Sequence, residues 1–193
     1  MTTSYTSTLK FLLTAIGTLL VLIGQAAVAQ DQPSLIEPSK QHELLKQDVG
    51  TWDATIRIWP MAGAEPLESK GVEKNQLLKG GMWLITHFEG EAIGMPFVGM
   101  GTTGYDPAEK KYVGTWVDTM TPHMMITKSD YDEKTKTMTG QAETRDAISG
   151  EKYTAKIISR HTGDDTRVME MHRKDENGKE WKVMEISYKR SKK

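Results

Sequence analysis

Residues 51–59 read TWDATIRIW, and apolar and polar side chains alternate along this stretch with a period of two. In an extended chain the even-numbered positions share one face, and they are the apolar residues Trp52, Ala54, Ile56 and Ile58. The residues between them, Asp53, Thr55 and Arg57, share the opposite face. This pattern predicts a β-strand with one apolar face, and it marks the point where the helical period of the preceding residues ends.

One short amphipathic helix is predicted directly before this strand. Ser39 can cap the helix, Glu43 lies close to the capping-box position, and Gly50 ends it. The apolar residues that recur at helical spacing between these signals are Leu44, Leu45 and Val49. No second helix is expected after Gly50.

Turn signals recur regularly downstream. The segments that begin at residues 105, 131 and 174 read YDPAEKKY, YDEKTKTM and KDENGKEW. We therefore expect strands at about 51–60, 68–79, 82–91, 96–105, 111–120, 123–131, 135–145, 151–161, 166–174 and 180–190. Ten strands after one short helix predict an all-β fold, an antiparallel up-and-down barrel that leaves no open sheet edge.

The first 29 residues have the layout of a secretory signal peptide. Lys10 is their only charged side chain, an apolar run follows it, and Ala27-Val28-Ala29 precedes the expected cleavage site. The apolar run is shorter than the roughly 20 residues that a spanning helix needs, so no stable membrane span is expected after cleavage. We expect a periplasmic or secreted protein.

The remaining chain is expected to form one domain. Residues 30–38 have the composition of a short linker, and residues 39–193 are long enough for a single barrel with a core. The absence of Cys excludes a disulfide, so the core alone must hold the fold. Without Lys10, 24 basic residues face 26 acidic ones, and this balance does not favour a nucleic-acid partner.

Several segments resemble a known bacterial family over about residues 40–190. They read HELLKQDVGTWDA, GMPFVGMGTTGYDPAEKKYVGTWVDTM, YDEKTKTMTGQAE and GKEWKVMEISYKR. The family is catalogued as domain of unknown function 1579. The resemblance implies a lipocalin-like, or calycin, barrel in an exported protein whose activity is uncharacterised.

Calycin barrels enter their first strand through a Gly-x-Trp motif at the closed end, and a basic residue of the last strand stacks on that Trp. Gly50-Thr51-Trp52 fits the motif, and Lys189 or Arg190 could supply the cation. A cation over an indole face contributes about 0.5–2 kcal/mol, depending on desolvation. Trp52 and Arg190 are therefore the candidates for barrel closure.

Residues 99–104 match G-x-G-x-x-G, the pattern of a dinucleotide-binding turn. That turn needs a helix after it, whereas Tyr105-Asp106-Pro107 begins a β-turn here. We interpret these glycines as positions that let a barrel strand bend or that leave room inside it.

The spacing of the methionine and histidine residues does not indicate a metal or haem site. On a strand, Met169 and Met171 share one face and His172 the other, so this segment cannot chelate one ion locally. The five histidines, at positions 42, 87, 123, 161 and 172, form no short-range ligand pair. No cofactor is predicted, and copper or haem remain as alternatives.

Catalytic motifs are also scarce. The chain has no Cys and no G-x-S-x-G segment, and its paired acids at Asp164-Asp165 and Asp175-Glu176 fall in expected turns. The protein is therefore expected to be a binder rather than an enzyme. An acid–base enzyme that acts in the lumen remains an alternative.

The segment YVGTWVD, residues 112–118, gives the best candidate for a binding site. Trp116 and Asp118 share a strand face, and if this face points inward, a carboxylate lies beside an indole in an apolar space. In the opposite phase Val113 and Val117 would point inward instead. The candidate ligand-binding residues are Trp83, Tyr105, Trp116, Asp118 and Met125.

The leading hypothesis is a barrel that binds a small, largely apolar molecule in its lumen. The alternative from another class is a structural or interaction module whose barrel is filled by side chains. The sequence indicates no oligomeric state.

Overall fold

The computed structural model describes residues 37–146 and 149–192. The expected signal peptide, residues 1–29, lies outside the described residues, as does all of the expected linker except Glu37 and Pro38. Within the described part of the chain, no helix has the length and apolar character needed to cross a membrane.

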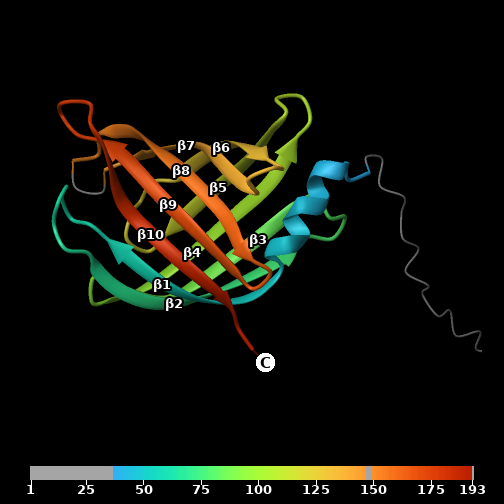
Figure 1. Ribbon diagram of the computed structural model, residues 1–193, viewed down its shortest axis with the longest axis horizontal. Helices are drawn as coiled ribbons and strands as arrows, with labels where there is room; N and C mark the ends of the chain where they lie inside the picture. The colour runs from blue at the N-terminus through green and yellow to red at the C-terminus, as the bar shows by residue number, and fades with distance from the viewer. Residues whose placement is uncertain (1–36, 147–148, 193) are drawn as a thin grey trace, which may run out of the picture. The chain divides into compact units, whose positions relative to one another are not determined.

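Ten antiparallel strands close into a barrel (Figure 1). Each strand pairs with the next one along the chain, and the last strand pairs with the first. The strands are β1 (Gly50–Ile58), β2 (Leu67–Leu77), β3 (Trp83–Ala92), β4 (Met95–Asp106), β5 (Lys111–Asp118), β6 (Met125–Asp132), β7 (Thr137–Arg145), β8 (Lys152–Gly163), β9 (Thr166–Lys174) and β10 (Glu180–Arg190). The predicted up-and-down barrel is confirmed, with all ten strands in place.

The helix η1 (Lys40–Asp48) covers the end of the barrel at which β1 begins (Figure 1). Leu45 on its inner side packs against Leu84 and Tyr112 of the barrel. The Tyr112 hydroxyl also donates a hydrogen bond to the carbonyl oxygen of Gln41, at 2.9 Å. We call this the closed end of the barrel.

The capping of η1 differs from the prediction. The backbone N–H of Ser39 donates to Nδ1 of His42 at 3.0 Å, so His42 and not Glu43 completes the capping box. The element is a 3₁₀ helix, and the third position after the cap is His42. Glu43 forms an exposed ion pair with Lys46 instead.

The inner face of β1 is the apolar face that its sequence predicts. Trp52, Ala54 and Ile56 are buried, and they pack with Phe88, Ile186 and Tyr188 in the main core. This core occupies one wall of the lumen.

Trp52 and Arg190 lie in contact at the closed end. The Arg190 guanidinium lies 4.1 Å from the centre of the Trp52 ring and donates hydrogen bonds to the carbonyls of Val49 and Gln47, at 2.7 and 3.0 Å. Gly50 has a φ of 123°, and a Cβ there would lie 2.9 Å from the guanidinium. The glycine of the Gly-x-Trp motif therefore leaves room for the arginine.

The glycines of residues 99–104 lie within β4 and accommodate two tryptophans. The Trp116 ring lies against Gly99 and Gly101 on the inner face, and a Cβ at Gly101 would approach it to 3.0 Å. The Trp83 ring covers Gly104 on the outer face. These glycines therefore leave room for indole rings, as a barrel strand requires, and no helix follows them.

Candidate functional site

A cavity of about 220 Å³ lies in the barrel lumen. Its apolar wall includes Trp116, Met125 and Ile157, which come from β5, β6 and β8. Its opposite end reaches the polar side chains beneath η1. The lumen thus combines an apolar wall with a polar region at the closed end, and small-molecule pockets likewise pair apolar walls with polar groups that orient the ligand.

Trp116 lies on the inner face of β5, and Val117 is exposed on the outer face. The indole Nε1 donates a hydrogen bond to Oδ2 of Asp118 at 2.9 Å. The other carboxylate oxygen of Asp118 accepts the backbone N–H groups of Met120 and Thr121, each at 2.9 Å. Asp118 therefore orients the indole and the following turn, and both of its oxygens have partners.

Met125 lies beside Trp116 in the lumen wall, because the two residues are paired across β5 and β6. On the other side of the indole, the Phe97 ring stacks at a centroid distance of 6.4 Å. Trp116 and Met125 thus line the apolar half of the lumen, and Phe97 supports the indole.

Tyr105 does not line the lumen cavity. It packs at the closed end between His42 and Tyr112, with ring centroids 5.9 and 5.1 Å away. It supports the helix that covers the barrel.

Trp83 lies outside the barrel, where its side chain is 39% exposed. The expectation that it lines the lumen is wrong. Leu84, the next residue, occupies the inner position, and consecutive residues of a strand point to opposite faces.

A group of polar residues at the closed end was missed by the sequence analysis. We call it the closed-end cluster, and its members are Asp48, Glu73, Asn75, His161 and Arg167, all of which line the cavity. They come from η1, β2, β8 and β9. The alternation along β9 could have indicated Arg167, since it shares a face with Met169 and Met171.

Arg167 is the central member of this cluster and is only 8% exposed. Its guanidinium forms an ion pair with Glu73, and its Nε lies 3.4 Å from Oδ1 of Asp48. It also lies over the rings of Tyr188 and Trp52, at 3.9 and 4.9 Å from their centres. Two carboxylates and two aromatic faces thus hold one buried cation.

Asp48 accepts a hydrogen bond from Nε2 of His161, with a distance of 3.1 Å. Burial raises the pKa of the Asp48 carboxyl, but this hydrogen bond and the charge of Arg167 outweigh it and hold the pKa below its usual value. Burial, together with the negative charge of Glu73, raises the pKa of the Tyr188 hydroxyl well above its usual value. Asp48 is therefore ionised and Tyr188 neutral at neutral pH.

Asn75 connects the cluster to the helix. Its Nδ2 donates hydrogen bonds to the carbonyl oxygen of Asp48 at 3.0 Å and to Oε1 of Glu73 at 2.6 Å. Its Oδ1 is buried and accepts no hydrogen bond from the described residues. Because a buried acceptor without a donor costs about 1–3 kcal/mol, this atom is a candidate for a ligand contact.

Several hydroxyl groups also line the lumen without a hydrogen-bond partner among residues 37–146 and 149–192. They belong to Thr86, Thr127, Ser129 and Ser159. Ser129 and Ser159 lie near the closed-end cluster, whereas Thr127 adjoins the apolar half. The cavity wall therefore offers hydrogen-bonding hydroxyl groups to a ligand both near the closed-end cluster and near the apolar half.

The methionine and histidine pattern of β9 agrees with the predicted alternation. Met169 and Met171 pack in the core, while His172 lies on the other face beside Glu170, at 3.3 Å. In the described part of the chain, no three His, Cys, Asp or Glu side chains are grouped as metal ligands.

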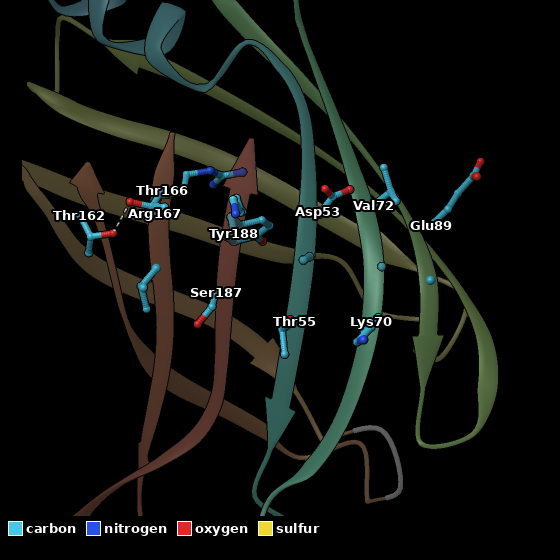
Figure 2. Close-up of a pocket in the computed structure, with 15 residues that line it drawn as sticks. Asp53, Thr55, Lys70, Val72, Glu89, Thr162, Thr166, Arg167, Ser187 and Tyr188 are labelled. Carbon is cyan, nitrogen blue, oxygen red and sulfur yellow. Dashed lines mark hydrogen bonds between the residues drawn. The ribbon is translucent and has the colours of Figure 1, made fainter. Parts of the chain in front are cut away.

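A second hollow, of about 900 Å³, opens on the outer side of β1, β2, β9 and β10. Figure 2 shows the short side chains Thr55 and Ser187 and the charged residues Asp53 and Lys70 along this surface. Binding pockets enclose a ligand between mostly apolar walls. The lumen encloses a ligand more completely than the outer hollow does.

The sequence profile of the family described as "Protein of unknown function (DUF1579)" matches residues 37–190. The chain belongs to the DUF1579 family. A search of curated protein sequences returned no match for this DUF1579 protein.

Among solved structures, the DUF1579 barrel is similar to an S-type phycobiliprotein lyase from Guillardia theta. The identity is 14%, the match covers 79% of this chain and 93% of the lyase, and the TM-score is 0.52. A redesigned β-barrel also matches, with 14% identity, coverage of 81% of this chain and 100% of that chain, and a TM-score of 0.40. The likeness to the lyase identifies the fold as lipocalin-like.

Proposed function

We propose that this DUF1579 protein binds a small, largely apolar molecule in its barrel lumen. The observation that carries the proposal is the cavity between Trp116 and the closed-end cluster, in which an apolar wall faces hydroxyl groups without partners. Its volume of about 220 Å³ is below the ~300–1,000 Å³ of drug-sized pockets. The ligand is therefore compact, with a body about as large as a single aromatic ring.

The similarity to a phycobiliprotein lyase supports the choice of the lumen as the binding site, because that protein has the same kind of barrel. It supports no particular reaction here, since the identity is only 14%.

We also propose that the protein acts outside the cytoplasm after cleavage behind Ala29. The N-terminal sequence of the mature protein would begin at Gln30 if this is correct.

Native mass spectrometry of protein purified from its own exported fraction tests the binding proposal. A small molecule should be retained by the wild type and by a Trp83→Ala variant, because Trp83 lies outside the barrel. A Trp116→Ala variant should lose it, since this indole forms the apolar wall. Equal retention by both variants, in folded protein, would contradict binding in the lumen.

An interaction surface is the second candidate function. The outer face of β4, β5 and β6 carries neighbouring apolar side chains that are 38–50% exposed, namely Val98, Met100, Val117 and Ile126. Exposed apolar patches mark contact surfaces in many proteins. A Met100→Glu variant that abolishes self-association in sedimentation velocity, with an unchanged lumen, would support this function.

A further inference from the structure

We propose that the lumenal ligand carries a primary ammonium group, bound beside Asp48 and Asn75, with its apolar body along Trp116 and Met125. This inference rests on the proposed function and adds the chemical class of the ligand. It follows from the charges of the closed-end cluster, from its hydrogen-bonding groups and from the shape of the cavity.

The charges of the cluster favour a cation. Asp48 and Glu73 supply two carboxylates, Arg167 supplies one guanidinium, and His161 shares a hydrogen bond with Asp48. The carboxylates of the cluster therefore outnumber its guanidinium two to one. An anionic head group would meet both carboxylates, whereas Arg167 is already paired with them.

Two other cations near this end do not reverse the balance. The Arg190 guanidinium donates to two backbone carbonyls and to the exposed carboxylate of Asp165, at 3.0 Å for the latter. Lys136 lines the rim of the cavity, but it is exposed to solvent at the turn between β6 and β7. The charge of Arg190 helps to lower the pKa of the Asp48 carboxyl, but neither side chain forms an ion pair with Asp48 or Glu73.

The hydrogen-bonding groups favour a donor. Oδ1 of Asn75 has no donor although the residue is only 6% exposed, and Oδ2 of Asp48 accepts no hydrogen bond from the described residues. Nε of Arg167 also lacks a hydrogen bond, but it already lies 3.4 Å from Oδ1 of Asp48, with which it forms an ion pair. An ammonium group offers three donors and no acceptor, so it complements these oxygens.

The rest of the cavity favours an apolar body. Beyond the cluster its wall passes from the hydroxyls of Ser129 and Ser159 to Trp116 and Met125. An aromatic ring stacks well on an indole and contacts a methionine thioether favourably. A short arylalkylamine therefore matches both halves of the lumen.

Isothermal titration calorimetry at pH 7 with three probes tests the head group. The probes are 2-phenylethylamine, 2-phenylethanol and 3-phenylpropanoate, which share a body and differ in charge. We expect the amine to bind at least tenfold more tightly than the alcohol and the carboxylate. An Asp48→Asn variant should weaken amine binding at least tenfold and leave the alcohol unaffected.

A matched control and a second variant keep the test decisive. Asp53→Asn removes an exposed carboxylate on the outer face of β1 and should leave all three affinities unchanged. If Asp48→Asn does not fold, Asn75→Ala, which removes the partnerless acceptor, should lower amine affinity about fivefold. Folding of each variant is checked by circular dichroism.

The outcomes separate this inference from the broader function. Tighter binding of the alcohol or the carboxylate, abolished by Trp116→Ala, would refute the ammonium head group and leave lumenal binding intact. Amine binding that is equal in wild type, Asp48→Asn and Asn75→Ala would also refute it. The absence of binding by all three probes, together with no co-purified molecule, would refute both proposals.

Discussion

Trp83 and Trp116 lie against opposite faces of the same strand, and each indole rests on a glycine of β4. A Cβ at Gly104 would come within 2.7 Å of the Trp83 ring, and one at Gly101 within 3.0 Å of the Trp116 ring. One indole therefore lies in the lumen and the other lies outside, and each of them needs a glycine in β4 to make room for its ring. This arrangement gives the chain a matched pair of tryptophans for mutagenesis.

Gly99→Ala should displace the Trp116 indole, because the new Cβ would overlap the six-membered ring of the indole. We expect a loss of about 1–3 kcal/mol in the free energy of unfolding, as is usual when a packed interior is overfilled. Tryptophan fluorescence and urea unfolding measure the two effects. Val98→Ala, on the outer face of the same strand, should change neither by much, and an equal effect of both variants would contradict the role of Gly99.

Asp118→Ala should destabilise the hairpin between β5 and β6. The variant loses three hydrogen bonds and leaves the Trp116 Nε1 donor unpaired, so we expect a cost of about 1–3 kcal/mol in urea unfolding. Asp130→Ala removes an exposed partner of Lys111 and should cost no more than about 1 kcal/mol. If Asp118→Ala changes only ligand affinity, the carboxylate contacts the ligand directly and its structural assignment is wrong.

Arg190→Lys should weaken the closed end even though it keeps the charge. A lysine cannot donate to Val49 and Gln47 together while it covers the Trp52 ring, because it lacks the planar guanidinium. We expect thermal unfolding to show a loss of about 1–2 kcal/mol. The control is Lys189→Arg, which exchanges the same two residue types at the exposed neighbouring position. It should leave the free energy of unfolding unchanged.

Asp48 should make the protein sensitive to acid. Its folded pKa is lower than its usual value of 3.8, so the stabilisation it contributes is present above that pH and is lost as the pH falls through the folded pKa. The free energy of unfolding should therefore fall more steeply in the wild type than in Asp48→Asn as the pH drops below about 4. Parallel curves for the two proteins would show that Asp48 is not stabilised as an anion.

The strands could be predicted from the sequence because their signals are local. Alternation in residues 51–59 and turn chemistry at YDPAEKKY depend only on neighbouring residues, and the observed boundaries lie within two residues of the expected ones. Alternation placed Tyr112 and Trp116 on one face of β5, but it left open whether that face points inward, and only the structure decides this. The phase of β3 could not be predicted either, since both Trp83 and Leu84 are large and apolar.

The closed-end cluster could not be assembled from local patterns. Glu73 and Arg167 are 94 positions apart, and only closure of the barrel brings their side chains together. The sequence did contain one signal of this cluster, a charged residue at a strand position that points inward. Arg167 precedes Met169 on the same face, and a buried arginine requires carboxylate partners.

The pairing of β1 with β10 has a consequence for the order in which the chain can fold. β1 follows the helix at the start of the domain, whereas β10 is the last strand to leave the ribosome. Until β10 is synthesised, both β1 and β9 expose unpaired backbone edges, and Trp52 lacks the cation that covers it. The nascent barrel therefore cannot close, and its two open edges stay prone to association, until β10 has left the ribosome.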